Sequence, residues 1–136
     1  MLIVGFRGIG EELVVDKYKD KVIALDYDVE EVTNENLIAF IEQVKESLLK
    51  YDVVILSYVS EVILCLDTLG IKYIVIYPTE LDADRIRDHQ DCYSIFKALG
   101  TKNDVAVLNV NETLEQYLQT KFEWIKIDEV QEEVVE

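Results

Sequence analysis

The chain has 136 residues and carries 28 Asp and Glu against 13 Lys and Arg, a formal net charge of −15. A protein of this sign repels DNA, RNA and anionic membranes, so we expect no direct nucleic-acid binding and no membrane partner. Half of the residues are hydrophobic and no Gly, Ser or Pro-rich linker divides the chain. We therefore predict a single α/β domain over residues 1–127, followed by an acidic tail at 128–136.

The first half of the chain alternates apolar runs with a long amphipathic segment. Short apolar runs predict strands at residues 2–4, 22–25 and 53–56. Between the last two, apolar residues recur at helical spacing, which predicts a helix over residues 34–50 capped by Thr33 or Asn34. The third run, VVIL, is too apolar to be half exposed and predicts a central strand.

The second half continues the alternation with shorter elements. We expect a helix at 60–69, a strand at 71–77, helices at 80–88 and 91–99, and a strand at 105–108. Gly70 ends the first of these helices and Gly100 the last, while Pro78 ends the longer strand. Asn111 is the expected cap of a further helix. Trp124, Ile125 and Ile127 then alternate toward a final strand.

Buried strands joined through helices imply right-handed crossovers and a mainly parallel sheet. The predicted fold class is therefore α/β, a three-layer sandwich. Ligands of such folds bind beyond the carboxyl ends of the strands. At that edge we expect four segments to gather, residues 5–12, 26–31, 57–60 and 78–82.

Soft metal ligands and targeting signals are scarce. The chain has two isolated cysteines, Cys65 and Cys92, and one histidine, His89. We predict no metal site and no disulfide, with His89 as a surface residue of an acidic loop and Cys65 as a buried thiol. The absence of a long apolar run and of a signal-peptide pattern favours a cytoplasmic location.

The stretch GFRGIGEE, residues 5–12, has the outline of the phosphate-binding loop G-x-x-x-x-G-K-[S/T]. Gly5, Gly8 and Gly10 keep the backbone freedom that such a loop needs. Glu11 and Glu12 stand where Lys and Ser/Thr bind the phosphates and magnesium. Each carboxylate would oppose triphosphate binding by roughly 1 to 4 kcal/mol.

Three readings of the loop stay open. In the first, Arg7 reaches a phosphate in place of the lysine, although the geometry of a guanidinium differs from that of an ammonium. Alternatively, Glu11 and Glu12 face the unpaired N–H groups at the start of a following helix, and the loop is filled by its own acids. In the third, the glycines are a coincidence at the junction between a strand and a turn.

The wider pattern resembles the small P-loop nucleoside and adenylate kinases of phages of Gram-positive bacteria. The resemblance spans roughly residues 1–125 and is carried by GFRGIGEE, VIALDYD, YDVVILS and EVILCLDTLGIKYIVIYP. It implies a P-loop-kinase-like topology and a nucleotide site. The residues of that site would be Gly5, Arg7, Gly8, Gly10, Glu11, Glu12, Asp26 and Asp28.

The departures from the family fall at positions that carry its chemistry. Glu11 and Glu12 replace Lys and Ser, and Val29 replaces the serine of a D-x-D-S turn. The Arg-rich lid shrinks to ADRIRDHQD, with only Arg85 and Arg87. Phosphoryl transfer depends on positioned positive charge, so we expect a vestigial site with no catalytic residue and no cofactor. The aspartates of that turn are expected to cap or solvate it.

Three functions compete. The first is a non-catalytic phage-type protein that binds a protein with a basic surface, in one version an inhibitor of host defence of the anti-CRISPR or nucleic-acid-mimic type. The second is a residual nucleoside or nucleotide-binding protein or small kinase. The third is an oligomerisation role, with the oligomeric state left open. Its interface would use four tyrosines, Tyr18, Tyr58, Tyr93 and Tyr117.

Overall fold

The computed structural model describes residues 1–122. Its strands are β1 (Leu2–Gly5), β2 (Val22–Leu25), β3 (Val53–Leu56), β4 (Ile74–Pro78) and β5 (Asp104–Leu108). Its helices are α1 (Glu11–Lys17), α2 (Asn34–Lys50), α3 (Ser60–Leu69), α4 (Ala83–Ile86), the 3-10 turn η1 (Arg87–His89), α5 (Gln90–Gly100) and α6 (Leu114–Gln119).

The five strands form one parallel sheet in the order β2-β3-β1-β4-β5. The middle strand is β1, where Ile3 lies opposite Ile55 of β3 on one side and Ile74 of β4 on the other. All four residues of β3 are buried, as expected for a strand with neighbours on both sides and helices on both faces. The predicted α/β class and mainly parallel sheet are confirmed.

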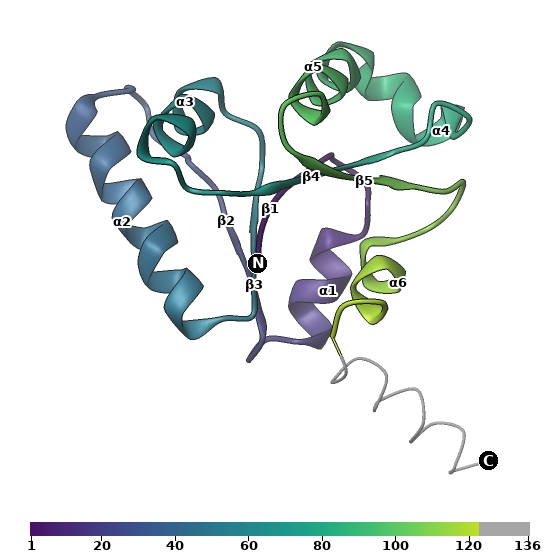
Figure 1. Ribbon diagram of the computed structural model, residues 1–136, viewed down its shortest axis with the longest axis horizontal. Helices are drawn as coiled ribbons and strands as arrows, with labels where there is room; N and C mark the ends of the chain where they lie inside the picture. The colour runs from purple at the N-terminus through teal and green to yellow at the C-terminus, as the bar shows by residue number, and fades with distance from the viewer. Residues whose placement is uncertain (123–136) are drawn as a thin grey trace.

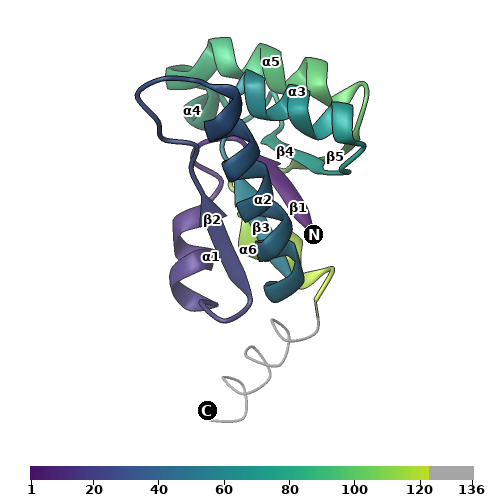
Figure 2. The same cartoon turned by 90° about the vertical axis from the view of Figure 1, so that its left-hand side faces the viewer.

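Helices cover both faces of this sheet in three layers (Figures 1 and 2). On one face α1 packs beside α6, where the Tyr18 hydroxyl donates to Glu115 Oε2 at 2.8 Å and Lys17 Nζ lies 3.0 Å from the same oxygen. The other face carries α2, α3 and α5. The apolar core fills the space between these layers and includes buried side chains from all five strands.

Two helix ends follow the sequence closely. Of the two cap candidates before α2, Thr33 is the cap, and its hydroxyl accepts a hydrogen bond from the Asn36 amide at 3.1 Å. Helix α3 ends at Gly70, whose φ of 70° lies in the left-handed region that glycine adopts without strain. Both boundaries confirm the prediction. Each depends only on residues within about one turn of the helix end, which a sequence pattern can reveal.

The predicted bounds of β4 are wrong at both ends. The strand begins at Ile74 because the preceding residues close α3, where the Ile71 amide donates to the Leu66 carbonyl at 2.9 Å. It also includes Pro78, which lies opposite Leu108 of β5. Because Pro78 has no N–H, the Leu108 carbonyl accepts a hydrogen bond from the amide of the next residue, Thr79. A proline is tolerated at a strand end where no N–H is required.

The predicted bounds of the helix at 80–88 are wrong, whereas the helix predicted at 91–99 is found within one residue at each end as α5. Asp82 caps a single turn, α4, which passes through η1 into α5. Helix α5 includes Gly100, so this glycine does not stop it. A Cβ at position 100 would lie 3.3 Å from the Tyr77 hydroxyl and 3.3 Å from Val105 Cγ2, and this close approach explains the glycine.

The last described helix begins later than predicted. Asn111 is not its cap but a left-handed residue with φ 64°, a conformation that asparagine tolerates better than most residues. The cap is Thr113, which forms a reciprocal capping box with Gln116. The predicted final strand at residues 124–127 and the acidic tail at 128–136 lie outside the described residues, so both stay predictions.

The four tyrosines of the proposed interface do not share one environment. Tyr18 and Tyr93 are buried in the core, while Tyr58 and Tyr117 are half-buried. Burial raises the pKa of Tyr18 to about 12, and the hydrogen bond to Glu115 adds to this shift. Tyr18 and Tyr93 therefore serve the packing of this chain rather than an exposed interface.

Candidate functional site

A cleft of about 670 Å³ opens at the carboxyl ends of β1, β2 and β3, the edge where α/β proteins bind ligands. Its walls come from four parts of the chain: Gly5, Phe6, Arg7, Glu11, Glu12, Ala24, Asp26, Ile55, Leu56, Ser57, Tyr58, His89, Cys92 and Phe96. Three of the four expected segments contribute. The fourth, residues 78–82, does not line the cleft, and the start of α5 takes its place.

The glycine-rich loop follows β1 and is held by the core from both sides. Phe6 and Ile9 are 1% and 0% exposed. The Phe6 amide donates to the Ile76 carbonyl at 2.9 Å, and the Ile9 carbonyl accepts from the Leu114 amide of α6 at 2.7 Å. The loop is therefore anchored to the core through both buried side chains and both hydrogen bonds.

Two of the three glycines have a local structural reason. Gly10 immediately precedes α1 with φ 91°, and Gly8 has the same φ. A side chain in this left-handed region is strained, so glycine is required at the turn whether or not a ligand binds. The turn therefore accounts for these two glycines without a phosphate, and they are not by themselves evidence for a phosphate site.

Glu11 and Glu12 form the first turn of α1, and both line the cleft. Neither carboxylate accepts a hydrogen bond within residues 1–122. Their place in the first helical turn is the one expected if the acids face the positive end of the helix dipole, and the filling of the loop by these acids stays a prediction. Glu11 Oε2 is buried and has no partner among the described residues. A ligand donor or cation would satisfy this oxygen, whereas a phosphate would add to its repulsion.

The remaining predicted site residues divide into two groups. Arg7 is exposed at the cleft and makes no hydrogen bond or ion pair with the described part of the chain. Asp26 also lines the cleft, where the Ser57 hydroxyl lies 3.5 Å from its Oδ1. Gly8, Gly10 and Asp28 lie outside the lining. The cleft thus brings together three carboxylates and one guanidinium.

An aromatic wall formed by Phe6, Tyr58, His89 and Phe96 lines part of the cleft, and sequence reasoning missed it. The Phe6 ring makes edge contacts with His89, Tyr93 and Phe96, with centroids 5.9, 5.9 and 5.4 Å away. His89 is half-buried against this ring and is not the surface histidine that we expected. His89, Tyr93 and Phe96 are four and three positions apart, which indicates a shared helical face but not what that face contacts.

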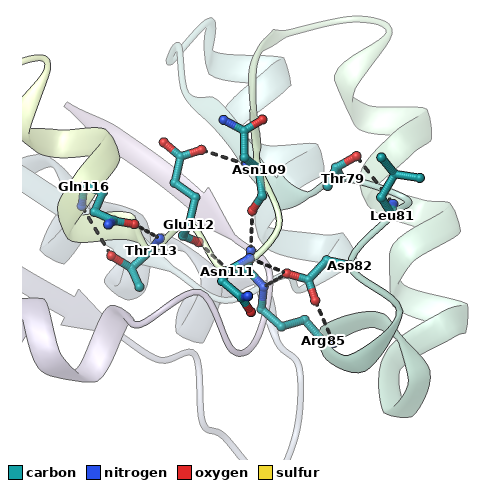
Figure 3. Close-up of polar contacts among 9 residues, drawn as sticks. All are labelled: Thr79, Leu81, Asp82, Arg85, Asn109, Asn111, Glu112, Thr113 and Gln116. Atoms are coloured by element: carbon teal, nitrogen blue, oxygen red, sulfur yellow. Dashed lines mark hydrogen bonds and ion pairs between the residues drawn. The ribbon is translucent and has the colours of Figure 1, made fainter.

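Arg85, expected in a phosphate-binding lid, belongs to a polar network away from the cleft (Figure 3). Its Nε donates to Asp82 Oδ2 at 2.7 Å, its Nη1 to the Glu112 carbonyl at 2.6 Å, and its Nη2 to the Asn109 carbonyl at 2.8 Å. The Asn111 amide donates to the same Asp82 oxygen at 3.0 Å. This network joins the loop after β4 to the loop after β5.

The electrostatics of Asp82 fit this structural role. The Asn111 amide is the main cause that lowers the pKa of Asp82, and Arg85 adds to it against the opposing effect of burial. The other lid residue, Arg87, is exposed and lies 3.6 Å from Asp84. Neither arginine lines the cleft, so only Arg7 supplies a guanidinium there.

Within residues 1–122, no group of three or more His, Cys, Asp or Glu side chains is placed to hold a metal ion. None of the helices in the described part of the chain is long and apolar enough to cross a lipid bilayer. No model of a known protein family matches the chain, and no curated protein sequence matches it.

Proposed function

We propose that the protein is a non-catalytic, cytoplasmic binding protein built on a P-loop-kinase-like scaffold, which acts on a protein with a basic surface. The observation that carries the proposal is the charge of the cleft. Glu11 and Glu12 line it at the positions where a phosphate-binding loop carries Lys and Ser or Thr, and Arg85 donates to carbonyls outside the cleft. Phosphoryl transfer needs positioned cations at these places. The strand, glycine loop and helix formed by β1, residues 5–10 and α1 support the scaffold assignment.

The net charge of −15 supports a partner of opposite sign. An acidic surface accelerates the encounter with a basic protein and discriminates against acidic ones. A protein that binds nucleic acid is one such partner, and an inhibitor that covers its basic channel is the version of this function that we propose to test. In that version the acidic surface competes with the phosphate backbone.

A second candidate function is the binding of a neutral nucleoside. The cleft volume of about 670 Å³ is in the range of small-molecule sites, and its aromatic wall suits a planar base. A nucleoside carries no phosphate and escapes the repulsion of the carboxylates. In a thermal-shift panel, a nucleoside at 100 times its Kd would stabilise the protein by about 2.7 kcal/mol. A panel without any shift excludes this candidate.

Nucleotide binding is the first test of the proposed function. We expect no binding heat for ATP or nucleoside monophosphates with magnesium, and measurable heat for the Glu11→Lys, Glu12→Ser double variant. Removing two repulsions of roughly 1 to 4 kcal/mol each should raise the affinity for ATP at least about thirtyfold. The Asp16→Lys, Asp20→Ser variant is the control, because it makes the same charge change at exposed positions outside the cleft. Binding by the unmodified protein would overturn the proposal.

The basic partner is tested by the salt dependence of its association. The immobilised protein should retain a partner from a Gram-positive bacterial lysate at low salt. The association rate of the purified partner should then fall at least about tenfold as the ionic strength rises to 1 M, where the Debye length is about 3 Å. An association rate that does not change with salt, or the absence of any retained protein, would contradict a partner recognised by its charge.

A further inference from the structure

A second hollow lies on the outer surface of the helical layer formed by α2 and α3, away from the cleft. These helices lie side by side in both views of the molecule (Figures 1 and 2). The groove between them has a volume of about 460 Å³. Six apolar side chains line it: Leu37, Ile38, Ile41, Leu64, Cys65 and Leu69.

Three of these side chains are largely exposed to solvent. Ile38 is 63% exposed, Leu64 67% and Leu69 55%. Single exposed apolar residues are common on protein surfaces, but these three border one groove and belong to two different helices. A continuous apolar groove of this kind is typical of a surface that a partner covers.

Four acids lie at or beside the groove, and we call them its acidic rim; of the four, Glu42 alone lines the groove itself. On α2, Glu35, Glu42 and Glu46 are seven and four residues apart, which places them on one stripe beside Ile38. On α3, Glu61 lies one turn before the groove residues Leu64 and Cys65. Lys45 also lines the groove, and its Nζ lies 3.5 Å from Glu42 Oε1, so the unpaired acids beside the groove are Glu35, Glu46 and Glu61.

We propose that this groove binds a basic amphipathic helix of the protein partner. Apolar residues on one face of that helix, spaced i, i+3 or i+4 and i+7, fill the groove, and Lys or Arg residues beside them pair with the acidic rim. This inference rests on the proposed function, because it gives the basic partner its docking face. The cleft takes no part in it.

Charge decides between this occupant and two others. A second copy of the chain would bring a net charge of −15 to an already acidic rim. The segment DEVQEEVVE at residues 128–136 carries five acids and no base, so the same rim repels it. A basic helix is the occupant that satisfies both the apolar floor and the acidic rim.

The test uses a synthetic 18-residue peptide of Leu, Lys and Ala with all leucines on one helical face. A second peptide has the same composition but a scrambled order. Fluorescence anisotropy should show binding of the first peptide only. The Ile38→Asn, Leu64→Asn variant should bind it at least about tenfold more weakly, because two exposed groove contacts are lost. Leu13→Asn, at a residue of α1 that is 72% exposed, should bind it like the unmodified protein.

A charge variant tests the rim separately. Glu42→Lys, Glu46→Lys should weaken the peptide severalfold more than Asp16→Lys, Asp20→Lys, which changes the net charge equally at exposed positions on the α1 side. No peptide binding, equal binding of the scrambled peptide, or equal loss in the two charge variants would overturn the groove assignment. Because Glu11→Lys, Glu12→Ser leaves the groove intact, its nucleotide binding tests the proposed function independently of the peptide result.

Discussion

Replacing Phe6 with alanine should lower the free energy of unfolding by about 3 to 5 kcal/mol. Phe6 is 1% exposed and makes edge contacts with three rings, so its removal leaves a cavity between the loop and α5. Phe6→Leu should cost less, about 1 to 2 kcal/mol, because most of the volume stays. Urea unfolding measures both values.

The matched control for Phe6 is Leu13→Ala. Leu13 is 72% exposed on the first helix after the loop, and its substitution should change stability by less than about 0.5 kcal/mol. A loss below about 1 kcal/mol for Phe6→Ala would mean that the glycine loop is not packed into the core as described. The loop would then be free to reorganise around a ligand, which would contradict its anchoring in the core.

Replacing Arg85 with alanine should lower the free energy of unfolding by about 2 to 4 kcal/mol. The substitution removes three hydrogen bonds and leaves the nearly buried Asp82 without its cation. Arg85→Lys should lose most of the same stability, since an ammonium cannot reach the carboxylate and two carbonyls in the planar geometry of a guanidinium. A phosphate-binding arginine of a lid would instead have little effect on the stability of the unliganded protein.

The control for Arg85 is Arg87→Ala, which removes a solvent-exposed pair with Asp84 and should cost less than about 0.5 kcal/mol. The pH dependence gives a second check. Because the pKa of Asp82 is lowered below 3.8, its contribution is present above that pH and is lost as the pH falls through the lowered value. The stability difference between the unmodified protein and Asp82→Asn should therefore shrink in acid. Equal effects of Arg85→Ala and Arg87→Ala would contradict the network.

The elements that could be predicted are those that depend on short-range signals. Helix α2 has 17 residues of apolar periodicity and a local cap, and its predicted bounds agree with the structure. The α3 stop at Gly70 is equally local. The cap of α6 is local as well, since Thr113 and Gln116 form the capping-box pattern, and the prediction missed it. The contact between the Asn111 amide and Asp82, 29 residues earlier in the sequence, is one that no local pattern reveals.

The candidate site divides in the same way. The acidic loop and the position of Asp26 beside it follow from strand ends in a parallel sheet, and both could be predicted. The aromatic wall and the role of Arg85 could not, since both depend on how α5 and the loop after β5 pack against the sheet. A family resemblance even misdirects at Arg85, because a lid arginine and a structural arginine look alike in sequence.

The central position of β1 has a consequence for how the chain is made. Ile3 pairs with Ile55 and Ile74, 52 and 71 residues later in the sequence. At a synthesis rate of about 5 to 20 residues per second, about 4 to 14 s pass between the synthesis of β1 and the synthesis of the second strand that pairs with it. Such distant pairings also make folding slow, in the range of milliseconds to seconds. Until then the nascent chain exposes an apolar strand, and its surplus of negative charge disfavours association with other nascent copies.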